Sequence, residues 1–328
     1  MEAFVAIKYQ QLRDFSEKIN TTFYFIRQNF KSLGKALIFI AGPPALLVSL
    51  VFGNLFSDLF SQIAASKADP QATLSFFTSV SFWLQMTFIS ATGIVAYVLT
   101  LATVNSYLKL YERAQTNKID LTRIWEEVRS IFLKYLGAVI LYVVLFVVVL
   151  LIGMIPVVIL STVSPVLVFF GFSAFFVGSM YIWIATQPIF VIQVFENRGF
   201  FEALTRSFFL VKGKWWSTFG LVFILSLIGG VLSYVIVLPF SIVANATLMH
   251  DITEQSQLNF DGPMATVFQA MFALYYVTQI LFSSLTHLGI AFQYFNLVEI
   301  KEARGLMSDI EKFGQAPDTA TNQREEQY

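Results

Sequence analysis

The sequence predicts an all-α integral membrane protein with six transmembrane helices and three amphipathic helices at the cytoplasmic surface. Three observations support this fold class. Hydrophobic residues make up 56% of the 328 residues and charged residues only 13%, whereas about a quarter of the residues in a soluble domain are charged. Long stretches without any charged side chain recur along the chain, and the Lys and Arg residues gather in alternate connecting segments. A bilayer is therefore the expected solvent for most of this chain.

The six spans are predicted from stretches that lack Asp, Glu, Lys and Arg, because a helix needs about 20 mostly apolar residues to cross the hydrocarbon core. Five stretches are long enough, and the one from 135 to 195 is long enough for two helices. The sequence STVSP at 161–165 supplies a turn near its middle. The expected spans are 36–57, 77–104, 136–160, 165–193, 217–243 and 265–297.

Orientation follows from the cations, because connecting segments rich in Lys and Arg stay in the cytoplasm. Of the 21 Lys and Arg residues, 20 lie in the N-terminal segment, in the segments after the second and fourth spans, and in the C-terminal tail. The opposite side has only Lys67. Both termini are therefore predicted to be cytoplasmic.

A charged segment with an apolar residue at every third or fourth position precedes the first, third and fifth spans. Such helices lie along a membrane surface, and they are expected at 10–33, 120–135 and 200–215. The first and third align without a gap. We interpret the chain as three copies of one surface helix plus a two-helix hairpin; a coincidence of apolar composition is the alternative. One domain would cover 1–312, followed by a disordered cytoplasmic tail at 313–328.

The stretch RSFFLVKGKWWSTFGL, residues 206–221, combines cations with tryptophans ahead of the fifth span. Tryptophan suits the headgroup region, and lysine meets anionic lipid there. A nucleic-acid site would need aromatic residues alternating with cations along a groove, and Lys plus Arg only equals Asp plus Glu at 21 each. No nucleic acid is therefore expected. The expected interfacial anchors are Arg206, Lys212, Lys214, Trp215, Trp216 and, in the second surface helix, Trp125.

The same passage resembles a known family. Pro188, Glu196 and the sequence FFEALTRSFFLVKGKWWSTFGL at 200–221 are similar to the membrane domain of some bacterial glycerophosphoryl diester phosphodiesterases and to stand-alone inner-membrane proteins of unassigned function. Thr205 stands where that family usually has a cation. The motif positions that we carry over are Pro188, Glu196, Arg206, Ser207, Gly213 and Gly220.

This resemblance implies a six-span protein of the bacterial inner membrane. In the enzymes of that family, phosphodiesterase activity resides in a separate soluble barrel domain. Only 299–328 follow the sixth span here. The resemblance therefore implies the membrane part without the enzyme.

No catalytic, cofactor or metal site is predicted. The chain has no cysteine, which excludes thiolate chemistry and disulfides. His250 beside Asp251 and Glu254 is more typical of a solvated loop than of a metal site. No charged residue lies in the middle of a span, so the ionisable relays of ion-coupled transporters are missing.

The most polar feature inside a span is a stripe on the sixth helix. Gln279, Ser283 and His287 follow one another at intervals of four residues, and Thr286 lies beside them. Interhelical hydrogen bonding within the bundle is the first interpretation of this stripe. The second is the polar wall of a cavity for a lipid headgroup or a small solute.

We expect a non-enzymatic protein that acts through contacts with membrane lipids and with another membrane or membrane-associated protein, in membrane organisation, docking or as an accessory subunit. The alternative is a carrier or scramblase-like transporter of a lipid or small amphiphile. The kinked, proline-containing spans and the polar stripe favour this alternative.

Overall fold

The computed structural model describes residues 5–66, 70–253 and 263–314, and all regular structure within them is α-helical. Six of the helices are long and apolar enough to cross a membrane. This confirms the predicted fold class of an all-α, multi-pass membrane protein. The predicted tail lies, from residue 315 onward, outside the described residues.

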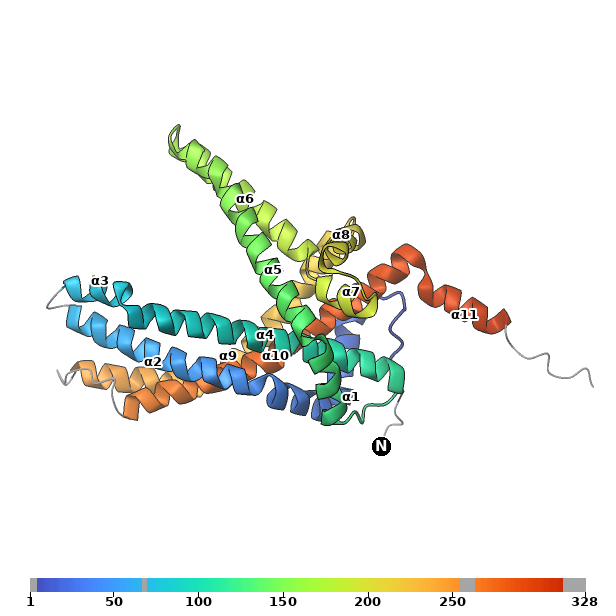
Figure 1. The fold of residues 1–328 in the computed structure, drawn as a ribbon, viewed down its shortest axis with the longest axis horizontal. Coiled ribbons are helices and arrows are strands. Elements are labelled where there is room, and N and C mark those ends of the chain that lie inside the picture. Colours follow the sequence, from blue (N-terminus) through green and yellow to red (C-terminus); the bar gives the residue numbers. More distant parts are fainter. Residues whose placement is uncertain (1–4, 67–69, 254–262, 315–328) are drawn as a thin grey trace, which may run out of the picture.

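Four long helices lie side by side as a bundle: α2 (Gly42–Ser66), α4 (Val80–Ala114), α9 (Trp215–Thr253) and α10 (Pro263–Glu302) (Figure 1). Helix α10 packs against both α9 and α2, and α2 packs against α4. The short helix α3 (Pro70–Thr78) leads into α4. Ser79 caps α4, because its hydroxyl accepts a hydrogen bond from the backbone N–H of Phe82 at 3.2 Å.

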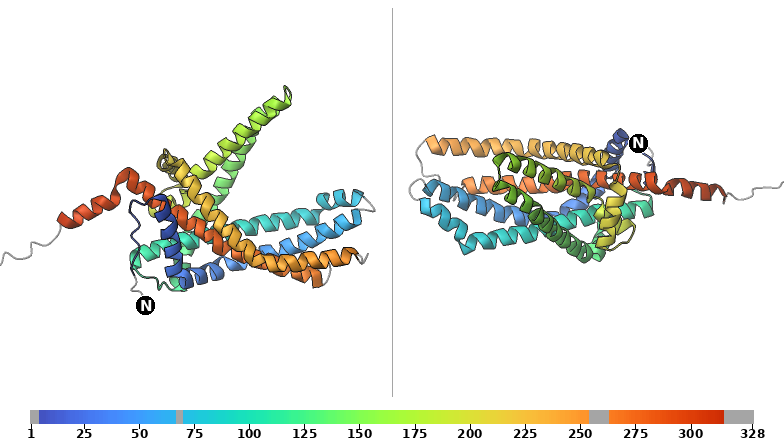
Figure 2. Two further views of the ribbon diagram at one scale, coloured as in Figure 1. Left: turned by 180° about the vertical axis from the view of Figure 1, so that it is seen from behind. Right: turned by 90° about the horizontal axis from the view of Figure 1, so that it is seen from above.

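The remaining two long helices form a hairpin that diverges from this bundle. Helix α5 (Leu121–Ser161) packs along α6 (Pro165–Ala185), and the pair contacts the bundle only near its base (Figures 1 and 2). The predicted turn at 161–165 is confirmed, with Ser164 as the N-cap and Pro165 in the first turn of α6. Only 6% of the most apolar window of each helix is buried by protein, so lipid is the expected surrounding of this hairpin.

One end of the bundle carries helices α1 (Phe15–Ile40), α7 (Ile189–Phe195), α8 (Phe200–Val211) and α11 (Arg304–Gly314), and we call it the basal end (Figure 1). The largest fully buried side chains gather there. Phe25 of α1 contacts the rings of Tyr107, Tyr111 and Phe292 edge-on, with centroids 5.0 to 6.1 Å apart. An aromatic core therefore joins α1, α4 and α10 at this end.

The first surface helix is shorter at its start and longer at its end than predicted. It begins at Phe15, where Asp14 and Glu17 form a capping box, and it continues to Ile40. Residues 36–40, predicted as the start of a span, therefore belong to α1. Helix α1 ends at Ala41, ahead of Pro43 and Pro44, because proline is tolerated in the first turn of a new helix but not within the preceding one.

The second surface helix is not a separate element. Asp120 caps α5 as predicted, but α5 then runs without a break through 120–135 and the third span. No proline and no capping residue interrupts it before Pro156, so nothing in the sequence ends the helix at the expected point. Only the first and third predicted copies thus share the layout of a separate helix followed by a pair of long helices.

Other boundaries also differ from the prediction. The fourth span ends at Ala185, and a turn that contains Pro188 separates it from α7. Proline cannot supply the backbone donor that a continuous helix would need there. Helix α11 was not predicted; Glu299 initiates it by accepting hydrogen bonds from the backbone N–H groups of Gly305 and Leu306, at 2.6 and 3.2 Å.

Candidate functional site

The four residues of the predicted polar stripe line one pocket. Gln279, Ser283, Thr286 and His287 form its α10 wall, and the cavity has a volume of about 440 Å³. The other walls are Tyr97 of α4, Trp183 and Gln187 from the end of α6 and the turn after it, and Ser226, Gly229 and Gly230 of α9. We call this cavity the lateral pocket, because it lies where the hairpin diverges from the bundle.

The stripe is only partly used for helix packing. Thr286 shares a hydrogen bond of 3.3 Å with Ser226 of α9, and the hydroxyl of Ser283 donates to the carbonyl of Ile280 in its own helix at 3.1 Å. Within the described part of the chain, Gln279 and His287 make no hydrogen bond and both face the lateral pocket. Thr286 thus fits the first interpretation, interhelical bonding, while Gln279 and His287 fit the second.

The glycines of α9 explain how this space arises. A Cβ at Gly229 would lie 3.1 Å from the backbone oxygen of Phe282, so α9 and α10 approach closely at this point. A Cβ at Gly230 would meet no atom within 4 Å, because Gly230 faces the open pocket. Helix α9 therefore packs closely against α10 at Gly229 and borders the open pocket at Gly230.

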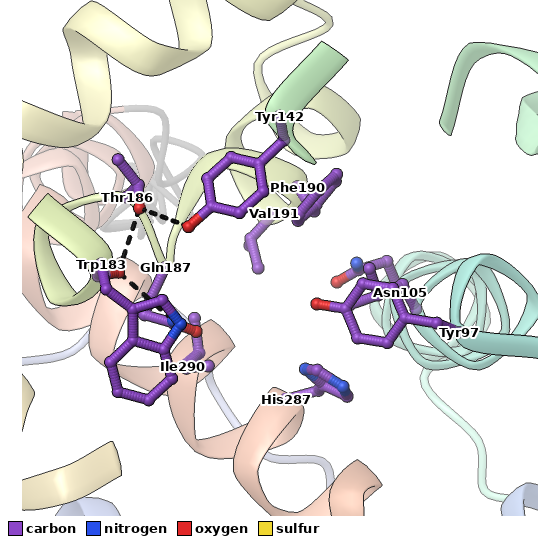
Figure 3. Close-up of a pocket in the computed structure, with 11 residues that line it drawn as sticks. Tyr97, Asn105, Tyr142, Trp183, Thr186, Gln187, Phe190, Val191, His287 and Ile290 are labelled. Carbon is purple, nitrogen blue, oxygen red and sulfur yellow. Dashed lines mark hydrogen bonds between the residues drawn. The ribbon is translucent and has the colours of Figure 1, made fainter. Parts of the chain in front are cut away.

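A smaller chamber of about 50 Å³ adjoins the lateral pocket and shares Tyr97, Trp183, Gln187 and His287 with it (Figure 3). The rings of Tyr97 and His287 meet edge-on with centroids 5.9 Å apart. Three elements that the prediction did not connect supply its other polar side chains: Asn105 of α4, Tyr142 of α5, and Thr186 in the turn after α6. In the sequence, each of these three is a polar residue inside a stretch without charged residues. That pattern does not reveal which helices contact one another.

The family-motif positions lie elsewhere, at the basal end. Glu196, whose side chain is 5% exposed, accepts hydrogen bonds from Nε and Nη2 of Arg206 at 3.0 to 3.1 Å. Arg206 also pairs with Glu302, and the hydroxyl of Tyr294 donates to Glu196 at 3.1 Å. Arg198 lies 2.7 Å from the same carboxylate. This ion network ties the α7–α8 connection to the end of α10.

The network also sets the protonation of its central carboxylate. Burial by itself would raise the pKa of Glu196, but the hydrogen bonds and positive charge of Arg206, together with the hydrogen bond from Tyr294, outweigh burial and lower this pKa. Glu196 is thus a charged structural anchor.

The other motif positions have structural roles too. Pro188 precedes α7 and ends the preceding turn. The buried hydroxyl of Ser207 donates to the carbonyl of Ala185 at 2.7 Å. Gly213 has a φ of +81° between α8 and α9, a conformation that disfavours other residues. A Cβ at Gly220 would lie 3.4 Å from the ring of Phe15, at ordinary van der Waals distance, so α1 packs beside α9 at Gly220 without requiring glycine there.

The predicted interfacial anchors divide into two groups. Lys212, Lys214, Trp125 and Trp216 are exposed, as an anchor in the headgroup region requires. Trp215 is half-buried; its ring stacks on Tyr181 and its Nε1 donates to the carbonyl of Tyr181 at 3.1 Å. Arg206 is not exposed to headgroups, because its side chain is only 10% exposed within the ion network.

A further cation is buried without having been predicted. Lys18 of α1 is 3% exposed and donates to Ser217 Oγ and to Gln293 Oε1, each at 2.8 Å. Burial lowers the pKa of Lys18, and the nearby charge of Lys214 acts in the same direction. The apolar stripe of α1 did not identify Lys18 as buried, because an amphipathic pattern does not show which polar side chains face a neighbouring helix.

The lateral pocket is suited to binding, since its walls offer neutral hydrogen-bonding groups within apolar helices. Among the described residues, no group of three or more His, Asp or Glu side chains is placed to hold a metal ion; Glu254 of the predicted outer loop lies outside them. Comparisons of the chain with family models, with curated proteins and with solved structures find no match.

Proposed function

We propose that this chain is a non-enzymatic, multi-pass protein of the bacterial inner membrane that binds an amphiphilic lipid between its bundle and its hairpin and acts as a carrier for it. One observation supports this proposal above the others. The polar stripe of α10 lines a pocket of about 440 Å³, which is within the usual range of about 300–1,000 Å³ for ligand sites. Membrane lipids are then both solvent and ligand.

The position of the pocket favours a lipid over a water-soluble solute. Its lining residues come from four of the six candidate membrane spans, and the hairpin that flanks it has largely exposed apolar surfaces. Acyl chains can extend from such a pocket along α6 into the bilayer, whereas a fully polar solute would meet apolar surface there. The cytoplasmic orientation of both termini, which we propose from the cation distribution, puts the basal end at the inner leaflet.

The test is to extract the protein at native expression level into a lipid-preserving polymer and to quantify the lipids that accompany it by mass spectrometry. Gly230→Leu fills the pocket, since a Cβ at Gly230 meets nothing within 4 Å. Gly34→Leu is the matched control, because Gly34 also has open space around it but lies on α1, which contributes no residue to the pocket. An enriched lipid should accompany the wild type and the control but not Gly230→Leu. Equal lipid content in all three proteins would contradict the proposal.

A second function, docking of a partner protein, is favoured by α11. This helix extends away from the bundle (Figure 2) and exposes Leu306, Met307 and Ile310, each more than half exposed. The same extraction tests it. A protein present in equal amount with the chain, and lost from a Leu306→Ser, Ile310→Ser double variant, would make the chain an accessory subunit; no such protein would leave lipid binding as the sole function.

A further inference from the structure

The small chamber beside the lateral pocket contains a buried hydrogen-bond acceptor without a partner. Asn105 is 2% exposed, and its Nδ2 donates to the hydroxyl of Tyr135 at 3.1 Å. Its Oδ1 has no hydrogen-bond partner. A buried oxygen in this state is unfavourable unless something donates to it.

The orientation of this amide is determined by its neighbours. Tyr135 donates its only hydroxyl proton to the carbonyl of Phe190 at 2.6 Å. Its oxygen can therefore only accept, so the Asn105 atom that faces it must be the nitrogen. Flipping the amide would put two acceptors together. Oδ1 is thus the amide atom that remains able to accept a hydrogen bond, and Asn105 is one of the residues that line the chamber.

A second acceptor comes from Tyr142. Thr186 Oγ1 lies 2.9 Å from the carbonyl of Ile182 and 3.0 Å from that of Trp183, and its proton is used by these carbonyls. The 3.0 Å contact between Thr186 and Tyr142 therefore has Tyr142 as the donor. The phenol oxygen of Tyr142, which also lines the chamber, keeps a lone pair that can accept a hydrogen bond.

The remaining polar groups of the chamber can donate. Tyr97 carries one hydroxyl proton, and a neutral imidazole at His287 carries one N–H; neither group makes a hydrogen bond within the described part of the chain. No Asp, Glu, Lys or Arg is among the described residues that line the chamber or the lateral pocket. A charged headgroup would thus be buried here without a counterion, which is strongly unfavourable.

We infer that the site binds the uncharged, hydroxyl-bearing head of a lipid, with a hydroxyl in the chamber that donates to Asn105 Oδ1 and accepts from Tyr97 or His287. This inference rests on the lipid-binding function proposed above. The chamber, at about 50 Å³, admits a group the size of a hydroxymethyl. The lateral pocket receives the remainder of the head, and the chains leave between α6 and α9. Diacylglycerols and neutral glycolipids share this chemistry.

The test uses the full chain in phosphatidylcholine nanodiscs that contain equal small amounts of four probes, followed by native mass spectrometry of the released protein. The probes are dioleoylglycerol, its 3-methyl ether, dioleoyl phosphatidic acid and monoglucosyl dioleoylglycerol. The methyl ether replaces the hydroxyl proton with a methyl group, which removes the donor, and phosphatidic acid replaces the hydroxyl with a charged phosphate. Dioleoylglycerol or the glucolipid should be retained about tenfold more than the methyl ether and phosphatidic acid, as expected for one hydrogen bond to a buried acceptor.

Two variants connect the result to the chamber. Asn105→Leu should abolish the difference between dioleoylglycerol and its methyl ether. Ser106→Ala is the matched control, because Ser106 is the next residue of α4 and its buried hydroxyl also lacks a partner, but it lines neither cavity. This control should keep the full difference.

The outcomes separate the two proposals. Preferential retention of the glucolipid over dioleoylglycerol would support the inference and identify a sugar head as the ligand. Equal retention of dioleoylglycerol, the glucolipid and the methyl ether would overturn the inference, with water as the occupant of the chamber, while lipid binding itself would stand. If the wild type retained no probe and no native lipid, both the inference and the proposed function would be refuted.

Discussion

The ion network at the basal end provides the sharpest stability prediction. Replacing Arg206 with Leu removes the two-pronged partner of Glu196, a carboxylate that is 5% exposed, and one partner of Glu302. Breaking a buried ion pair by removing one member costs about 3–5 kcal/mol, because the other charge stays buried. Arg198, 2.7 Å from Glu196, remains and compensates in part. We therefore expect the free energy of unfolding to fall by about 2–3 kcal/mol.

The assay is reversible unfolding in mixed micelles, followed by tryptophan fluorescence. Arg206→Lys should give an intermediate loss, because lysine cannot make the paired contacts of a guanidinium. Lys212→Leu is the surface control, since Lys212 is an exposed cation of the same segment, and such substitutions usually change stability by less than about 0.5 kcal/mol. If Arg206→Leu cost no more than Lys212→Leu, the network would not be what joins α7 and α8 to α10.

Three further predictions concern the same fold. Because the pKa of Glu196 is lowered in the folded chain, its contribution is present above the ordinary Glu pKa of about 4.3 and is lost as pH falls through the lower folded value. The free energy of unfolding of the wild type should therefore fall from neutral to acid pH, and the part of this fall that comes from Glu196 should be missing in Glu196→Gln. Gly213→Ala forces alanine to a φ of +81° and should cost about 1 kcal/mol in the same assay. Gly289→Ala would put a Cβ against Cδ1 of Leu225, whose fully buried side chain has little room to move, so it should lower stability by about 1–3 kcal/mol. Gly178→Ala should not lower stability, because a Cβ at Gly178 has open space. A loss equal to that of Gly289→Ala would contradict this prediction.

Features that depend on local chemistry were predictable from the sequence. The turn between α5 and α6 follows from Ser164 and Pro165, and the start of α5 follows from Asp120, because capping and proline geometry involve only neighbouring residues. The six spans follow from length and hydropathy for a similar reason, because whether a helix can cross a bilayer depends on its own length and composition. Glu196 and Arg206 are two of the motif positions that the resemblance names, but their spacing in the sequence does not reveal that they form an ion network.

The sequence by itself thus determined the all-α, six-span layout and the polar stripe on α10, because both are periodic or compositional properties of single segments. Only the tertiary structure decided that the α5–α6 hairpin diverges from the bundle, that Gln279 and His287 face a cavity there, and that Asn105, whose buried Oδ1 has no partner, lines the adjoining chamber. The physical reason is that apolar helices in lipid gain little from packing on one partner over another by hydrophobicity alone. Small residues and a few polar contacts choose the partners, and those contacts join residues far apart in the chain.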